Sequence, residues 1–183
     1  DVALGFRRLS IIDLDCGNQP MFNETGEVVI VFNGEIYNYQ ELTKELQAKG
    51  HVFENHSDTE CLIHAYEEYH EKMLKKLRGM FGFAIWDSKE KTLFAARDFF
   101  GIKPFYYAEI NGNLVFASEI KAILEYPEYK RELNEKALSH YLSFQYSAMD
   151  ETFFKGIYKL NPGCCLKYKD GKLKVSRYFD PTL

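Results

Sequence analysis

The sequence predicts an α+β fold in which amphipathic helices cover antiparallel β-sheets. Asn-Gly and Asp-Gly pairs at 111–112 and 170–171 lie between short apolar runs, which is typical of tight antiparallel hairpins. A continuous apolar run at 28–32 is typical of a strand that is covered on both faces. Polar caps followed by apolar residues three and four positions apart predict helices, and such helices need a sheet face to cover.

The helices can be placed from their start signals. Asn38 with Glu41 begins one helix, which Gly50 ends, and Ser57 with Glu60 begins a second. Asn134 caps a third helix, and Ser118–Glu119 is interpreted as the cap of a further helical stretch. The predicted buried positions on these helices are Leu42, Leu46, Cys61, Leu62, Ala65, Tyr66, Tyr69, Ala137, Leu138, Tyr141 and Leu142.

The strands are predicted from apolar and aromatic runs that end at turns. The charged segment 87–91 joins two of them into a hairpin. With 13 Tyr and 15 Phe, packed aromatic layers are expected. In chain order the predicted strands are 28–32, 80–86, 92–97, 105–110, 114–117, 166–169 and 173–178.

Length and composition fit one domain and limit the kinds of partner. A chain of 183 residues with 46% hydrophobic residues can bury a sizeable core. The net charge of −4 lacks the basic footprint that nucleic-acid binding requires. The sequence has no signal peptide and no apolar run of membrane-spanning length, which predicts a cytoplasmic protein.

The cysteines predict free thiols and no metal centre. Cys16, Cys61, Cys164 and Cys165 form no C-x-x-C pair and have no His at ligand spacing, so we expect no bound metal. Four free thiols indicate a reducing compartment. Cys164 and Cys165 are adjacent, and in an extended segment their side chains point to opposite faces.

The apolar run at 28–32 is followed by Asn33, Gly34 and Glu35, whose groups are suited to binding or catalysis. Taken alone, Asn33-Gly34 favours a turn, because this dipeptide is a strong hairpin signal. The alternative is a site at the end of a buried strand. There, an amide side chain, an unhindered backbone N–H and the Glu35 carboxylate could hold a small polar substrate and an oxyanion formed from it.

The motifs together resemble a known family. In their order and spacing they are similar to the class II, N-terminal-nucleophile glutamine amidotransferase domain of glutamine-hydrolysing asparagine synthetases. The resemblance covers essentially all of residues 1–183. It implies a four-layer αββα sandwich of two antiparallel sheets, of the N-terminal-nucleophile hydrolase type. The motifs that carry it are residues 5–13, 19–21, 28–38, 56–60, 78–81, 97–104 and 116–122.

The resemblance also implies a reaction and its partners. The domain would hydrolyse L-glutamine to glutamate and supply ammonia to a C-terminal synthetase domain for ATP-dependent amidation of aspartate. ATP and Mg belong to that synthetase domain, and no cofactor is expected in residues 1–183. A homodimer is compatible with this arrangement. Another carboxylate acceptor, or a glutamine-binding or scaffolding domain without a nucleophile, are the alternatives.

In such relatives the nucleophile is a Cys at the N-terminus of the mature chain, and its α-amino group can serve as the base. This sequence starts at Asp1, shortly before Arg8. The resemblance therefore implies that the N-terminal segment with its nucleophile, and the synthetase domain, are not part of the sequence. A chain of this kind is expected to be inactive alone.

The site residues implied by the resemblance recognise the two ends of glutamine. Arg8 would grip the α-carboxylate, since its planar fork suits bidentate binding. Asp58 would pair with the α-ammonium, although an acid there also suits a helix start. Asn33 and Gly34 would form the oxyanion hole. The remaining pocket residues are Leu9, Ser10, Ile11, Ile12 and Glu35.

The segment 97–104 has no assigned chemistry. A buried Arg97–Asp98 ion pair, a tight turn and docking to a partner domain are all open, and we favour a structural role.

Overall fold

The computed structural model describes residues 1–7, 18–146 and 149–180. The fold is α+β with two antiparallel sheets, as predicted. The larger sheet has the strand order β1-β2-β3-β4-β8-β9, and the smaller has the order β6-β5-β7.

The predicted elements occur in their predicted order, and the elements at 21–22, 70–75 and 158–159 were not predicted. The larger sheet contains β1 (Met21–Phe22), β2 (Val28–Ile36), β3 (Gly79–Asp87), β4 (Thr92–Arg97), β8 (Cys164–Lys169) and β9 (Lys172–Arg177). The smaller sheet contains β5 (Tyr106–Ile110), β6 (Asn113–Ala117) and β7 (Tyr158–Lys159). The helices are α1 (Tyr39–Ala48), α2 (Asp58–Tyr69), the 3-10 helix η1 (His70–Lys75), α3 (Ile120–Leu124) and α4 (Glu135–Phe144).

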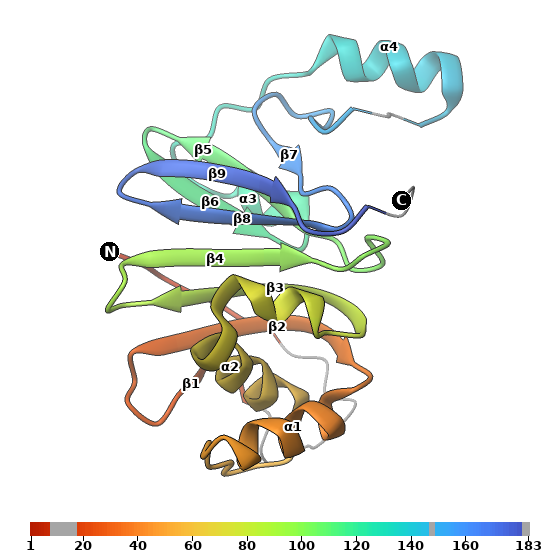
Figure 1. Cartoon of the computed structure of the whole chain (residues 1–183). Helices are drawn as coiled ribbons and strands as arrows, with labels where there is room; N and C mark the ends of the chain where they lie inside the picture. Colours follow the sequence, from red (N-terminus) through yellow and green to blue (C-terminus); the bar gives the residue numbers. More distant parts are fainter. Residues whose placement is uncertain (8–17, 147–148, 181–183) are drawn as a thin grey trace.

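The two faces of the larger sheet bury different cores. One face packs under α1 and α2, where Ile30 of β2 meets Leu42 and Leu62. The other face meets the smaller sheet through residues such as Val31 and Leu166. Figure 1 shows α2 in front of β2 and β3. The prediction that the strand at 28–32 is covered on both faces is therefore confirmed.

The outer face of the smaller sheet is covered in turn by α3. Ile123 of α3 packs with Ala108 and Ile157 in a third, smaller core. Phe105 and Phe116 stack with their ring centroids 5.5 Å apart, in the core between the two sheets. The predicted aromatic packing is thus present at the interface that joins the sheets.

The helix caps divide into local and long-range ones. The N–H of Glu60 donates to Ser57 Oγ (3.2 Å) and that of Ala137 to Asn134 Oδ1 (3.2 Å), which confirms both caps. Asn38 stands at the start of α1, but its side chain does not cap the helix. Instead its Nδ2 donates to the Lys76 carbonyl and its Oδ1 accepts from the Arg78 N–H. The asparagine thereby ties α1 to the segment after η1.

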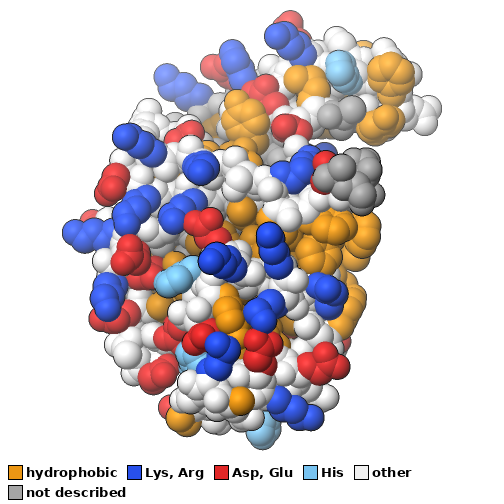
Figure 2. Space-filling view, viewed as in Figure 1, with side chains coloured by type: hydrophobic (Ala, Val, Ile, Leu, Met, Phe, Trp, Pro, Cys, Tyr) orange, Lys and Arg blue, Asp and Glu red, His pale blue; other side chains and the backbone are white. Residues whose placement is uncertain are grey.

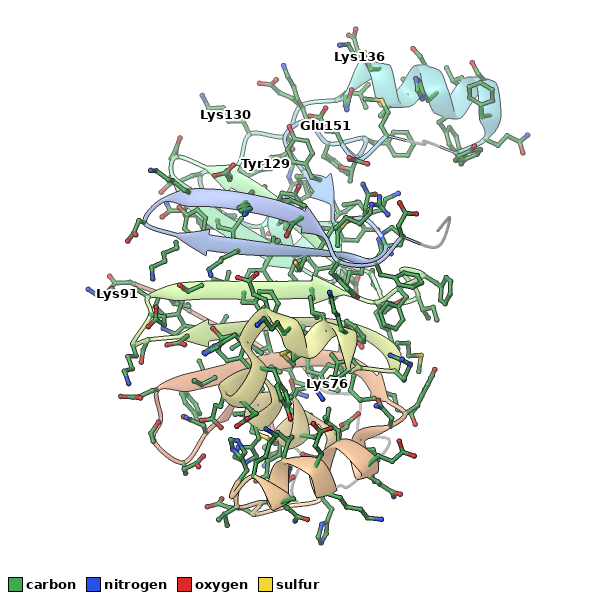
Figure 3. The ribbon with its side chains drawn as sticks, viewed as in Figure 1. Lys76, Lys91, Tyr129, Lys130, Lys136 and Glu151 are labelled. Carbon is green, nitrogen blue, oxygen red and sulfur yellow. The ribbon has the colours of Figure 1, made fainter. Side chains whose placement is uncertain are left out.

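Lys76 strengthens the same junction. Its Nζ lies 2.7 Å from Glu45 of α1 and 4.6 Å from the centroid of the Tyr69 ring of α2. Figure 3 labels this side chain next to the helix pair, and labels Lys91 at the far end of the sheet, in the β3–β4 turn. The charged turn predicted at 87–91 is confirmed by the pairing of β3 with β4.

The turn predicted for Asn33-Gly34 is wrong. Strand β2 runs on to Ile36, with Asn33 opposite Gly82 and Gly34 opposite Phe81 in β3. Unbroken pairing with a long neighbour outweighs the turn preference of the dipeptide. The hairpins predicted at 111–112 and 170–171 are confirmed, and all four turn residues have positive φ.

The buried face predicted for α4 is only partly right. Ala137 is buried, but Tyr141 is 45% and Leu142 75% exposed. Figure 1 shows why: α4 stands apart from both sheets, so no described layer covers that face. The cap predicted at Ser118 is also wrong. Helix α3 begins at Ile120, with Glu119 at its N-cap and no side-chain hydrogen bond there.

The predictions of free thiols and of opposite-facing Cys164 and Cys165 side chains are confirmed for the described residues. Cys61, Cys164 and Cys165 are free thiols. Cys164 packs into the core between the sheets and Cys165 into the core under the helices, so they point to opposite faces. Cys16 lies outside the described residues. Within the described residues, no helix is both long and apolar enough to cross a membrane.

Candidate active site

The second half of β2 and the start of α2 bring four predicted site residues together. Asn33, Gly34 and Glu35 follow one another in β2, and Asp58 is the first residue of α2. The Ile36 N–H donates to Asp58 Oδ2 at 3.0 Å, which holds the carboxylate at the end of the strand. Arg8, Leu9, Ser10, Ile11 and Ile12 lie outside the described residues.

The Gly34 N–H faces the edge of the sheet. In an antiparallel strand the N–H and C=O of one residue point to the same side. The N–H and C=O of Phe32 bond to the Gln19 side chain, and the N–H of Ile36 bonds to the Asp58 side chain. These backbone groups therefore point away from β3. Gly34 lies between them, at the same parity, so its N–H points the same way. The Gly34 N–H is thus a hydrogen-bond donor at the sheet edge, between the contacts made by the Gln19 and Asp58 side chains.

The pairing on the other side agrees with this orientation. Phe81 lies opposite Gly34, and its N–H donates to the Asp98 carboxylate while its carbonyl accepts from the Asp98 N–H, both on the side away from β2. Gly34 and Phe81 therefore form a non-hydrogen-bonded pair. The Gly34 N–H is not used by the ladder between β2 and β3.

Gly34 is required by the close approach of the two strands. A Cβ at this position would meet the backbone oxygen of Met80 and lie 2.8 Å from Phe81 Cα. In β3, a Cβ on Gly79 would lie 3.0 Å from Ile36 Cα. Because these neighbours are backbone atoms, they cannot rotate away. The glycines let β2 and β3 pair to their ends, which positions the N–H.

Gln19 is a residue of this region to which sequence analysis assigned no role. Its Oε1 accepts from the Phe32 N–H at 2.6 Å, and its Nε2 donates to the Phe32 carbonyl at 3.1 Å. The side-chain amide acts as a short continuation of β1 beside β2. The only signal in the sequence was its place in the motif at 19–21, which says nothing of this contact.

The carboxylates give the region a negative character. Asp58 is partly buried, and burial raises the pKa of its carboxyl above the ordinary value, with the charge of Glu35 adding to the increase. The hydrogen bond from Ile36 acts in the opposite direction. A cationic group placed between Asp58 and Glu35 would reduce their repulsion. Asn33 is exposed, so its amide is free to reach a ligand.

The segment after β4 supports the same end of the larger sheet. The buried Asp98 carboxylate accepts from the N–H groups of Phe81, Phe100, Ile102 and Lys103. This carboxylate therefore holds the loop after β4 against β3.

Arg97 supports the segment from its other side, by donating to the carbonyls of Gly101, Lys103 and Leu160. The tight turn has a positive φ at Gly101. The structural role that we favoured is thus supported. No Arg97–Asp98 ion pair occurs among the described residues, since each side chain binds backbone groups instead.

The described thiols are poorly suited to nucleophilic attack. Burial raises the pKa of Cys61 to about 12, and burial also raises the pKa of Cys164 and Cys165. The thiolate is the nucleophilic form, so these side chains are inert near neutral pH. All three lie in the cores on the two faces of the larger sheet.

Solved structures place this fold in a class. The chain is similar to glutamine phosphoribosylpyrophosphate amidotransferase from Bacillus subtilis, with a TM-score of 0.60 and 20% identity, over 88% of this chain and 32% of that one. It is also similar to an allosteric regulatory enzyme of purine biosynthesis, with a TM-score of 0.61 and 21% identity, over 88% and 31%. At 20–21% identity these similarities show a shared fold.

The sequence comparison shows the family. Residues 1–179 match the family described as glutamine amidotransferase domain, and the chain belongs to it. Over 97% of its length it is 45% identical to asparagine synthetase [glutamine-hydrolyzing] 1 of Bacillus subtilis, of which it covers 28%. Over 98% it is 42% identical to asparagine synthetase [glutamine-hydrolyzing] 3 of that bacterium, of which it covers 30%. The predicted resemblance is confirmed, and the chain spans less than a third of these relatives.

Proposed function

We propose that the chain is the glutaminase domain of a glutamine-hydrolysing asparagine synthetase. It would hydrolyse the side-chain amide of L-glutamine to glutamate and supply the ammonia for ATP-dependent amidation of aspartate. Family membership and the names of the similar proteins support this function. The structural observation that carries it is the grouping of Asn33, Gly34 and Asp58 at one end of β2.

The proposed mechanism uses this end of the strand as an oxyanion hole. The Asn33 side-chain amide and the Gly34 N–H would donate to the oxygen that becomes negative when the substrate amide is attacked. Loss of one such donor typically costs about 2.7–4 kcal/mol of transition-state stabilisation. Asp58 and Glu35 would hold the α-ammonium. Arg8 would bind the α-carboxylate, with the pocket completed by Leu9, Ser10, Ile11 and Ile12.

The proposed nucleophile is the thiol of a Cys at the N-terminus of the mature protein, outside residues 1–183. Its α-amino group would accept the thiol proton, because the usual pKa of about 7.7–8.0 suits a base near neutral pH. The raised pKa and the burial of Cys61, Cys164 and Cys165 argue against these thiols. With that segment in place, we propose the four-layer αββα sandwich of N-terminal-nucleophile hydrolases.

The proposed partner is a synthetase domain that carries ATP and Mg. Figure 2 shows hydrophobic side chains gathered at the end of the molecule beyond the C-terminal end of β4, where the exposed Phe100 and Ile102 follow that strand. Helix α4 exposes Leu142 and Phe144. Exposed apolar patches of this kind commonly mark protein interfaces, so they support docking of a further domain.

The proposal is tested with the Asn33→Ala variant of the native protein in a glutaminase assay. Because the amide would act only when the oxyanion forms, kcat and kcat/KM should fall together by about 10²–10³-fold. Asn113→Ala is the matched control, since Asn113 is exposed at the start of β6 in the other sheet. Native protein that releases no ammonia from glutamine would refute the function. An unchanged kcat in Asn33→Ala would refute only the oxyanion hole.

A further inference from the structure

Away from the candidate active site, two histidines and a glutamate converge beside α2. His64 and Glu67 are three residues apart on the helix and share a face. His51 follows Gly50 in the segment after α1, which ends at Ala48. Glu67 Oε2 lies 2.8 Å from His64 Nδ1 and 3.9 Å from His51 Nδ1. One ligand atom from each of the three residues lies within 4.8 Å of the others.

We propose that His51, His64 and Glu67 bind a divalent transition-metal ion, with Zn²⁺ as the best match. Two imidazole nitrogens and one carboxylate oxygen are a donor set that Zn²⁺ accepts, with a water molecule as the fourth tetrahedral ligand. Sequence analysis expected no metal here because it compared spacing along the chain. In the folded chain His51 lies beside the face of α2 that carries His64 and Glu67, although α2 begins only at Asp58.

The outer atoms of all three ligands face partners that would orient them. His51 Nε2 lies 3.3 Å from Glu68 Oε2, and His64 Nε2 lies 3.9 Å from Glu60 Oε1. Glu67 Oε1 accepts from Asn23 Nδ2 at 2.7 Å. The His51–Glu68 and Asn23–Glu67 contacts are hydrogen bonds of the kind that orient ligands in metal sites, whereas Glu60 lies beyond hydrogen-bond distance of His64.

These partners are themselves fixed in place. The Glu60 carboxylate accepts from the backbone N–H groups of Glu54 and Asn55, at 2.7 and 2.9 Å. Phe53 packs edge-on against the His64 ring, with centroids 4.6 Å apart. Zn–N and Zn–O bonds of about 2.0–2.1 Å place tetrahedral ligand atoms roughly 3.3 Å apart. Binding would therefore open the 2.8 Å contact between His64 and Glu67 and draw His51 closer to Glu67.

Burial leaves a route to the three ligand atoms. The His64 side chain is only 3% exposed, whereas His51 and Glu67 are 17% and 21% exposed. An ion could enter from the side of His51 and Glu67 and keep one water molecule. The competing interpretation is a hydrogen-bonded cluster in which the short His64–Glu67 contact needs no metal.

Isothermal titration calorimetry with ZnCl₂ on the native protein, treated first with a chelator, tests the site. We expect Zn²⁺ binding whose affinity falls in Glu67→Gln and in His51→Ala. Changes to residues that only orient metal ligands lower the affinity by about 10–100-fold, so loss of a ligand should lower it by at least as much. His140→Ala is the matched control, since His140 lies on the exposed face of α4. Binding should also raise the Tm of the unchanged protein and not that of Glu67→Gln.

A Co²⁺ absorption spectrum identifies the ligand atoms. Tetrahedral coordination without a thiolate charge-transfer band supports the site, whereas such a band assigns the ion to a cysteine and overturns it. Equal Zn²⁺ affinity in the unchanged protein, Glu67→Gln and His51→Ala also overturns it. Circular dichroism checks folding. If Glu67→Gln fails to fold, His51→Ala provides the deciding variant, since the His51 side chain is 17% exposed.

Discussion

Asp58 joins α2 to β2, and the same carboxylate faces the proposed ammonium position. Replacing Asp58 with Asn keeps an oxygen that can accept from the Ile36 N–H and removes the charge. A charged hydrogen bond is worth about 1.5–3 kcal/mol, so the glutamine KM of the native protein should rise by roughly 10–100-fold. Asp170→Asn, in the β8–β9 turn, is the control. An unchanged KM would remove Asp58 from the substrate site.

The raised pKa of Asp58 also predicts how stability depends on pH. Because the folded protein holds this proton more tightly than the unfolded chain, the free energy of unfolding falls as pH rises from the usual value of about 3.9 through the raised pKa. Asp58→Asn should therefore be less sensitive to pH in this window. Urea unfolding at a series of pH values measures it, and parallel curves for both proteins would contradict the prediction.

At the scale of elements, Gly34 limits how β2 can pair with β3. Gly34→Ala places a methyl group against the backbone of Met80 and Phe81, and should lower the free energy of unfolding by about 1–3 kcal/mol. Gly5→Ala is the control, because a Cβ on Gly5 has no atom within 4 Å among the described residues. Equal stability of Gly34→Ala and the unchanged protein, in thermal unfolding, would show that the strands can separate here.

A comparison of the Asn-Gly pairs at 33–34 and 111–112 shows what could be predicted from the sequence. At Asn111-Gly112 the flanking strands are short and the pair forms the hairpin, so a local signal was sufficient. At Asn33-Gly34 the same dipeptide continues a strand, because β3 pairs with β2 along its whole length. The longer strands, the hairpins and the caps at Ser57 and Asn134 follow from such local chemistry, whereas the two-residue strands β1 and β7 were not predicted.

What could not be predicted depends on residues distant in the chain. The Gln19 amide bonds to Phe32, and the Asp58 carboxylate bonds to Ile36. Motif resemblance placed Asp58 in the site but could not supply this contact. The exposed Leu142 is the opposite case: its spacing on α4 predicts burial, yet the described layers do not reach it.

At the scale of the whole molecule, the core between the two sheets should make them unfold together. Val31 and Leu93 of the larger sheet share this core with Phe105, next to the smaller one. A core shared by the two sheets favours one cooperative transition. Far-UV and near-UV circular dichroism should therefore give the same midpoint.

Leu166 tests that core most directly, since it is fully buried between the sheets. Leu166→Ala should lower the free energy of unfolding by about 2–5 kcal/mol, because it removes buried methyl groups and leaves a cavity. Leu142→Ala is the matched change at a side chain that is 75% exposed, and should alter it by less than about 0.5 kcal/mol. Urea unfolding of both variants measures the difference. Separate far-UV and near-UV transitions in Leu166→Ala would mean that the sheets unfold independently. If Leu142→Ala lowered the free energy of unfolding as much as Leu166→Ala, the outer face of α4 would be covered.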